Sequence, residues 1–166
     1  MTDPTEPNPQ AKLRDHQGTR TPMESAETSE KTQTTISGGC RCGSVRYVIN
    51  GQPRRHSLCC CADCRRSAGA PIVGWAVVKA ETLTVTGNLA TFNSSGDVER
   101  SFCPRCGTGL FYRSETLFPG SIDVQSSTFD DPNILPPTEI IQMAEAPSWL
   151  PIIGTLPQHR RFPQAS

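Results

Sequence analysis

The sequence of 166 residues has no net charge and few aromatic residues. Lysine and arginine together number 16, aspartate and glutamate also number 16, and Phe, Trp and Tyr make up 6% of the chain. Without a basic excess the chain has no overall field that attracts nucleic acid, and few aromatic rings are available to stack on bases. These two absences argue against nucleic acid as a partner.

The sequence also has no long apolar run. The longest one, residues 71–78, is interrupted by Gly74 and is too short to cross a bilayer. The N-terminal residues contain no basic segment followed by an apolar stretch, which a secretory signal requires. We therefore expect no membrane contact and a cytoplasmic location.

A sustained helical period of apolar residues is absent too, and 15 prolines and 13 glycines interrupt the chain. Short runs of alternating or β-branched residues predict strands instead, and Asn50-Gly51 predicts a hairpin turn after the first of them. Short helical turns are expected only after Cys64 and near residues 147–150. The pattern predicts a mainly β fold with few or no long helices, its strands at residues 45–49, 72–78, 83–86, 90–92, 98–102, 110–112, 122–124 and 140–143.

The composition divides the chain into a tail and one domain. Residues 1–34 are rich in Thr, Glu, Pro and Ser and show no hydrophobic period, so we expect a disordered tail there. Residues 35–163 are enough for one domain with one modest core, and residues 164–166 form the C-terminal end.

Eight cysteines are the main chemical feature, and they fall into three clusters at residues 40–42, 59–64 and 103–106. Cytosolic thiols are kept reduced, so we interpret the clusters as metal ligands. A disulfide-stapled secreted domain is the alternative, and counting free thiols and zinc separates the two. A redox dithiol at Cys103 and Cys106 is a second alternative, but the βαβ context typical of it is missing.

The first predicted site is a structural zinc ion held by four thiolates. Cys103 and Cys106 enclose Pro104 and Arg105 and precede Gly107, which is typical of a zinc knuckle that supplies two sulfurs. Cys40 and Cys42 are the natural second pair, because alternate residues of an extended chain point to one side. Such a site would join the start of the domain to its middle.

The second predicted site has three thiolates, from Cys59, Cys61 and Cys64, and an open position typical of a reactive zinc centre. The same alternation turns Cys60 away, although a closed site that includes Cys60 is the alternative. A sulfur-rich metal centre suits a ligand that is itself a thiolate. Arg65 and Arg66 follow directly and are candidates for contacts with the carboxylates of such a ligand, or else for a solvated surface.

Three stretches and two later features make the sequence resemble the family of glutathione-dependent formaldehyde-activating enzymes, whose domain is shared with centromere protein V. The resemblance implies a β-tent-like fold stapled by zinc, with two zinc ions in the two sites above. It also implies a carbon–sulfur lyase activity that joins glutathione and formaldehyde into S-hydroxymethylglutathione. The resemblance is carried by residues 39–43 (Gly-Cys-Arg-Cys-Gly), 59–65 (Cys-Cys-Cys-Ala-Asp-Cys-Arg), 102–108 (Phe-Cys-Pro-Arg-Cys-Gly-Thr), 131–132 (Asp-Pro) and Trp149.

Two functions of different classes follow from the sequence. The first is a zinc-dependent carbon–sulfur lyase acting on an adduct of a small thiol such as glutathione. The second is a non-catalytic zinc module that binds protein or nucleic acid. The oligomeric state is open at this point.

Overall fold

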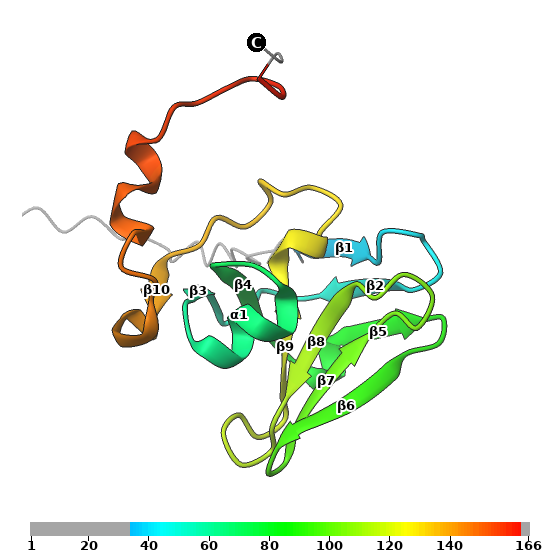
Figure 1. Cartoon of the computed structure of the whole chain (residues 1–166). Coiled ribbons are helices and arrows are strands. Elements are labelled where there is room, and N and C mark those ends of the chain that lie inside the picture. The colour runs from blue at the N-terminus through cyan, green and yellow to red at the C-terminus, as the bar shows by residue number, and fades with distance from the viewer. Residues whose placement is uncertain (1–33, 164–166) are drawn as a thin grey trace, which may run out of the picture. The chain divides into compact units, whose positions relative to one another are not determined.

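The computed structural model describes residues 34–163. The predicted tail, apart from residue 34, and the C-terminal end at residues 164–166 lie outside the described residues. Within them the chain forms two sheets (Figure 1). The smaller sheet is antiparallel and has the order β1 (Thr35–Gly39), β2 (Arg46–Asn50) and β5 (Leu83–Thr86).

The larger sheet has seven strands and is antiparallel except where β10 runs parallel to β3. The helices are short: α1 (Ala62–Ala68) and the 3-10 turns η1 (Ala80–Thr82), η2 (Ser126–Thr128), η3 (Met143–Glu145) and η4 (Leu150–Thr155). The predicted mainly β fold without long helices is thus confirmed. The order of the larger sheet is β10 (Glu139–Ile141), β3 (Arg55–Cys59), β4 (Val73–Lys79), β9 (Ser121–Gln125), β8 (Gly109–Arg113), β7 (Val98–Phe102) and β6 (Ala90–Ser95).

The hairpin predicted at Asn50-Gly51 is wrong. β2 pairs with β1 and β5, whereas the next strand, β3, pairs with β4 and β10 in the other sheet. Gly51 has φ +150, and its N–H donates to the carbonyl of Thr34 at 2.9 Å. Asn50 and Gly51 therefore lead the chain from the smaller sheet to the larger one. The dipeptide marks the bend correctly, but pairing depends on which apolar faces pack together.

A core of apolar side chains fills the space between the two sheets. Alternate positions of β2 are buried there, Tyr47 at 1% exposure and Ile49 at 0%, as a strand with one packed face requires. The Tyr47 hydroxyl lies 2.7 Å from Thr128 Oγ1, which satisfies its polar end beside η2. The same core includes Ile36, Val45, Ala76, Val78, Leu110, Phe111, Val124 and Phe129.

Helix α1 follows β3 after a two-residue connection and packs against β4. Its N-cap is Cys61, whose sulfur accepts a hydrogen bond from the Cys64 N–H at 3.3 Å. It ends at Gly69, which has φ +63, a conformation that costs glycine little. The sequence therefore confines the helix to two turns and places Cys61 at its N-cap and Cys64 in its first turn.

Among residues 34–163 we find no helix with the length and apolar character that crossing a bilayer requires.

Candidate functional site

Four cysteines from two distant segments meet in a first cluster. The sulfur atoms of Cys40, Cys42, Cys103 and Cys106 all lie within 4.8 Å of one another. The Sγ of Cys42 is 3.5 Å from that of Cys40 and 3.8 Å from that of Cys103. Cys40 and Cys103 are buried against the main core, whereas Cys42 and Cys106 are exposed. The cluster therefore connects the end of β1 with the segment that follows β7.

Tight turns bring these sulfurs together. The expectation that Cys40 and Cys42 alternate along extended chain is wrong, because a turn closed by the Gly43 N–H on the Cys40 carbonyl, at 3.0 Å, joins them. In the second segment the Gly107 N–H donates to the Cys103 carbonyl at 2.9 Å, and Gly107 has φ +74. The spacing of two residues thus forms the expected knuckle.

Two hydrogen bonds to sulfur also support this cluster. The Val45 N–H donates to Cys40 Sγ at 3.3 Å, and the Thr108 hydroxyl lies 3.2 Å from Cys106 Sγ. The hydrogen bond from Thr108 is the main reason that the pKa of Cys106 is lowered to about 5. Donors aimed at sulfur in this way favour the thiolate, which is the form that binds metal.

Three other cysteines form a second cluster. Cys59 is the last residue of β3, Cys61 caps α1 and Cys64 lies in its first turn, and their sulfurs are within 4.8 Å of one another. Cys59 and Cys64 are buried and pack with Trp75 of β4. Burial raises the pKa of Cys59 to about 12 and also raises that of Cys64. The two clusters match the division into four and three cysteines that the sequence predicts.

Cys60 lies between two members of the second cluster but is not part of it. Its side chain is fully buried, and its sulfur is 3.9 Å from Met143 Sδ. All eight cysteines of the chain are free. In this structure Cys60 is thus a packing residue between β3 and η3.

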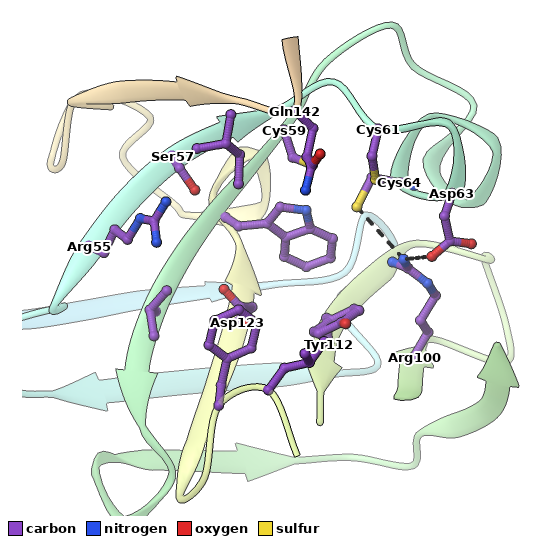
Figure 2. Close-up of a pocket in the computed structure, with 15 residues that line it drawn as sticks. Arg55, Ser57, Cys59, Cys61, Asp63, Cys64, Arg100, Tyr112, Asp123 and Gln142 are labelled. Carbon is purple, nitrogen blue, oxygen red and sulfur yellow. Dashed lines mark hydrogen bonds and ion pairs between the residues drawn. The ribbon is translucent and has the colours of Figure 1, made fainter. Parts of the chain in front are cut away.

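A cavity of about 190 Å³ opens beside the second cluster. It is smaller than the ~300–1,000 Å³ typical of pockets for drug-sized ligands. All three cysteines of the cluster line it, and none of the four cysteines of the first cluster does. Figure 2 shows the cysteines at one side of the cavity, with Asp63 and Arg100 beside them and Asp123 and Arg55 farther away. The remaining lining is mostly apolar and comes from Trp75, Val77, Tyr112, Leu117, Phe118 and Ile141, together with Ser57 and Gln142.

Arg100 of β7 places a positive charge next to the three-cysteine cluster. It is 6% exposed, and its Nη2 donates to Asp63 Oδ2 at 2.5 Å and to Cys64 Sγ at 3.7 Å. Its guanidinium also lies over the Tyr112 ring, 4.9 Å from the centroid. Burial opposes the charge, but the hydrogen bonds to Asp63 and Cys64 raise the pKa of Arg100 above its ordinary value. Arg100 therefore stays charged and faces the cysteines.

Sequence reasoning missed both Arg100 and Asp123. Arg100 is two residues from the buried Val98, and Asp123 is two residues from the buried Ser121. In β7 the charged Arg100 occupies an inward position between Val98 and Phe102, which buried charges do only when paired or functional. In β9, by contrast, Asp123 alternates with Ile122 and Val124 as a polar residue of an ordinary half-buried strand would. The break in the pattern of β7 was thus an available signal for Arg100, whereas the sequence offered none for Asp123.

Arg65 and Arg66, the predicted contacts for a thiol's carboxylates, do not line the cavity. Arg65 donates to the carbonyls of Cys60 at 3.0 Å and Glu145 at 3.2 Å, which ties α1 to η3. Both arginines border a separate open pocket with Trp149. Their role toward a ligand remains a prediction.

The geometry defines a class of protein: a small β domain with two cysteine clusters that could each hold a metal ion, one of them opening into a cavity. The model of the family of glutathione-dependent formaldehyde-activating enzymes matches residues 35–145. The chain belongs to this family.

Curated relatives agree with this assignment at low identity. A protein of Podospora anserina named among the glutathione-dependent formaldehyde-activating enzymes is 36% identical over 87 residues, which is 48% of this chain and 40% of the relative. One of Aspergillus flavus with the same kind of name is 32% identical over 83 residues, 48% of this chain and 44% of the relative. An uncharacterized lyase of Schizosaccharomyces pombe is 27% identical over 75 residues, 45% of this chain and 55% of the relative. The chain thus spans about half the length of these relatives.

A solved structure supports the fold. The crystal structure of a Rhodobacter sphaeroides protein superposes with a TM-score of 0.50 and 23% identity, covering 63% of this chain and 98% of that one. At this identity the likeness concerns the fold only.

Proposed function

We propose that this protein is a zinc-dependent enzyme of the carbon–sulfur lyase type that acts on the adduct of a small thiol and an aldehyde, with S-hydroxymethylglutathione as the first candidate. The observation that carries the proposal is the cavity bordered by the three-cysteine cluster. In a non-catalytic zinc module the metal would serve only to hold the fold, and the four-cysteine cluster already provides a site for such an ion. A second cluster that borders a cavity therefore favours the enzyme. The family assignment and the relatives' names supply the substrate class.

Zinc fits the first cluster well. A tetrahedron of sulfurs about 2.3 Å from zinc has edges of about 3.8 Å. The observed sulfur separations of 3.5 and 3.8 Å lie near that value. Cys40, Cys42, Cys103 and Cys106 would complete the coordination, so this ion would be structural.

The second cluster fits zinc with one position left for a ligand, because Cys59, Cys61 and Cys64 offer three sulfurs. Zinc bound there would supply a positive charge that favours the thiolate form of a thiol. The protein's own contribution is Arg100, which donates to Cys64 and balances the negative charge of the cluster. The apolar part of the wall would reduce contact with water once a ligand fills the cavity.

The size of the cavity indicates which part of a substrate it holds. At about 190 Å³ it accommodates the thiol and the hydroxymethyl group, while the rest of a tripeptide would extend outside. The outer carboxylates would then meet surface groups, for which Arg65 and Arg66 stay the candidates proposed from the sequence.

Metal content gives the first test. Protein purified without chelator is expected to hold up to two zinc ions per chain, one of which a mild chelator removes first, because three sulfurs bind less tightly than four. Elemental analysis during stepwise chelation measures this. Absence of zinc together with disulfides in a thiol titration would contradict the assignment of both clusters.

Activity gives the second test. With glutathione and formaldehyde at equilibrium, the protein is expected to speed the exchange between free and hydroxymethylated glutathione. Exchange spectroscopy by NMR is the suitable measurement, because thiols add to formaldehyde in water without a catalyst. Zinc-loaded protein that binds glutathione but leaves the exchange rate unchanged would favour the non-catalytic zinc module.

A further inference from the structure

Asp123 is a buried carboxyl group without a partner in the cavity beside the three cysteines. Its residue is 8% exposed, and it lines the cavity. Among residues 34–163 only burial and the more distant charge of Arg55 act on it, with no hydrogen bond. A carboxyl group left without donors in an apolar site costs folding free energy. Its free oxygens are therefore available to a ligand.

The strand register aims this side chain into the cavity. Asp123 of β9 is paired with Val77 of β4 and Tyr112 of β8, and both of these partners also line the cavity. Directly paired residues of neighbouring strands project from the same face of a sheet. Trp75, two residues before Val77, extends that face to Cys59 and Cys64. One continuous surface thus leads from the carboxyl group to the sulfurs.

Few charges face Asp123. Burial raises its pKa to about 6, and the positive charge of Arg55 opposes that rise. Arg100 is engaged by Asp63 and Cys64 at the opposite side (Figure 2). The other groups facing the cavity are Arg55 and Ser57 from β3, Trp75 and Val77 from β4, Arg100 from β7, Tyr112 from β8, Leu117 and Phe118 from the following loop, Asp63 from α1, Ile141 of β10, Gln142 after it, and the cysteines.

We propose that Asp123 is the acid–base group of the reaction, carrying one proton between the thiol sulfur and the oxygen of the aldehyde. This proposal rests on the proposed function. In the direction of addition the S–H bond breaks and its proton passes to the Asp123 carboxylate. The sulfur forms a bond to the carbonyl carbon, the π electron pair moves to oxygen, and Asp123 returns the proton to that oxygen. Cleavage is the reverse, and no oxidant or further reactant is needed.

The pH dependence follows from this cycle. The free protein must begin with a deprotonated Asp123 in either direction, because the substrates are a neutral thiol and a neutral hydroxymethyl adduct. The value of kcat/KM is therefore expected to rise with pH through about 6 and then level off. Arg55→Gln removes the charge that holds the pKa down, so the inflection is expected at higher pH.

The test compares the wild-type protein with Asp123→Asn, which keeps the shape but cannot accept a proton. Asp123→Asn is expected to slow the glutathione–formaldehyde exchange about 10²-fold at pH 7.5 and to lose the inflection near pH 6. Zinc content and glutathione affinity are expected to stay within about twofold of wild type, since the carboxyl group holds neither cluster. Asp131→Asn, the same change at an exposed carboxylate, is the matched control and is expected to behave like wild type.

A second readout needs no turnover. Calorimetry in buffers of different ionisation enthalpy counts the protons released when glutathione binds. Wild type is expected to release clearly less than one proton per thiol at pH 7, because Asp123 retains it beside the new negative charge. Asp123→Asn is expected to release about one.

The outcomes separate the two proposals. Wild-type protein that binds glutathione without speeding the exchange overturns the proposed function. Wild-type protein that speeds it, with Asp123→Asn equally fast or showing the same inflection, overturns only the role of Asp123. Equal proton release by wild type and by Asp123→Asn also overturns only the role of Asp123.

Discussion

Cys103→Ser is expected to abolish the cooperative unfolding transition and to leave most of the protein insoluble. Cys103 is fully buried in the main core and belongs to the four-cysteine cluster that links the end of β1 to the segment after β7. A structural zinc site contributes about 10–16 kcal/mol in isolated zinc fingers, whereas net stability is only about 5–15 kcal/mol. Loss of one ligand therefore weakens a term that is as large as the whole stability of the fold.

Soluble yield, zinc content and thermal unfolding of the variant measure this effect. Cys42→Ser distinguishes an effect of lost packing from an effect of lost metal, because Cys42 belongs to the same cluster but its side chain is exposed. If zinc is the cause, Cys42→Ser also loses the transition, and chelation of wild type to the metal-free form gives the same result. A Cys42→Ser protein that melts like wild type would show that Cys103 acts through packing alone.

Cys64→Ser is expected to leave the fold and one zinc ion in place while reducing the glutathione–formaldehyde exchange to the uncatalysed rate. Cys64 lies in the first turn of α1, contacts Arg100 and borders the cavity. Its cluster joins only β3 and α1, which are neighbours along the chain. The metal there closes a short loop, so its loss removes little folding free energy. The open coordination position, however, depends on all three sulfurs.

Zinc analysis, melting and exchange spectroscopy on Cys64→Ser test this expectation. Cys60→Ala is the matched control, because Cys60 lies in the same segment but its sulfur contacts Met143 instead of the cluster. The control is expected to keep both ions and the exchange activity, with a modest loss of stability from the lost buried sulfur. If Cys64→Ser unfolds as completely as Cys103→Ser, the second cluster is structural too, and the non-catalytic zinc module becomes the better interpretation.

The sequence predicted well those strands whose own residues alternate between apolar and polar. The runs at 83–86 and 122–124 lie in β5 and β9, because the apolar alternation of Leu83 with Val85 and of Ile122 with Val124 is visible without any partner. It missed β1 and β3, which contain Gly38, Gly39 and His56 and show no such alternation. These two strands are formed by pairing with β2 and β4, a contribution that a single sequence does not display.

The sequence by itself predicted the division of seven cysteines into groups of four and three, because the spacing within each segment and the four ligands that a structural zinc ion prefers leave few solutions. It could not determine that Arg100 and Asp123 face the same cavity, since they come from β7 and β9 and meet only through the order of the larger sheet. Nor could it show that Arg65 is engaged with the carbonyls of Cys60 and Glu145. The spacing of cysteines within one segment is a short-range property, whereas the charges that surround a ligand are placed by strand pairing across the whole domain. Only the tertiary structure decides the latter.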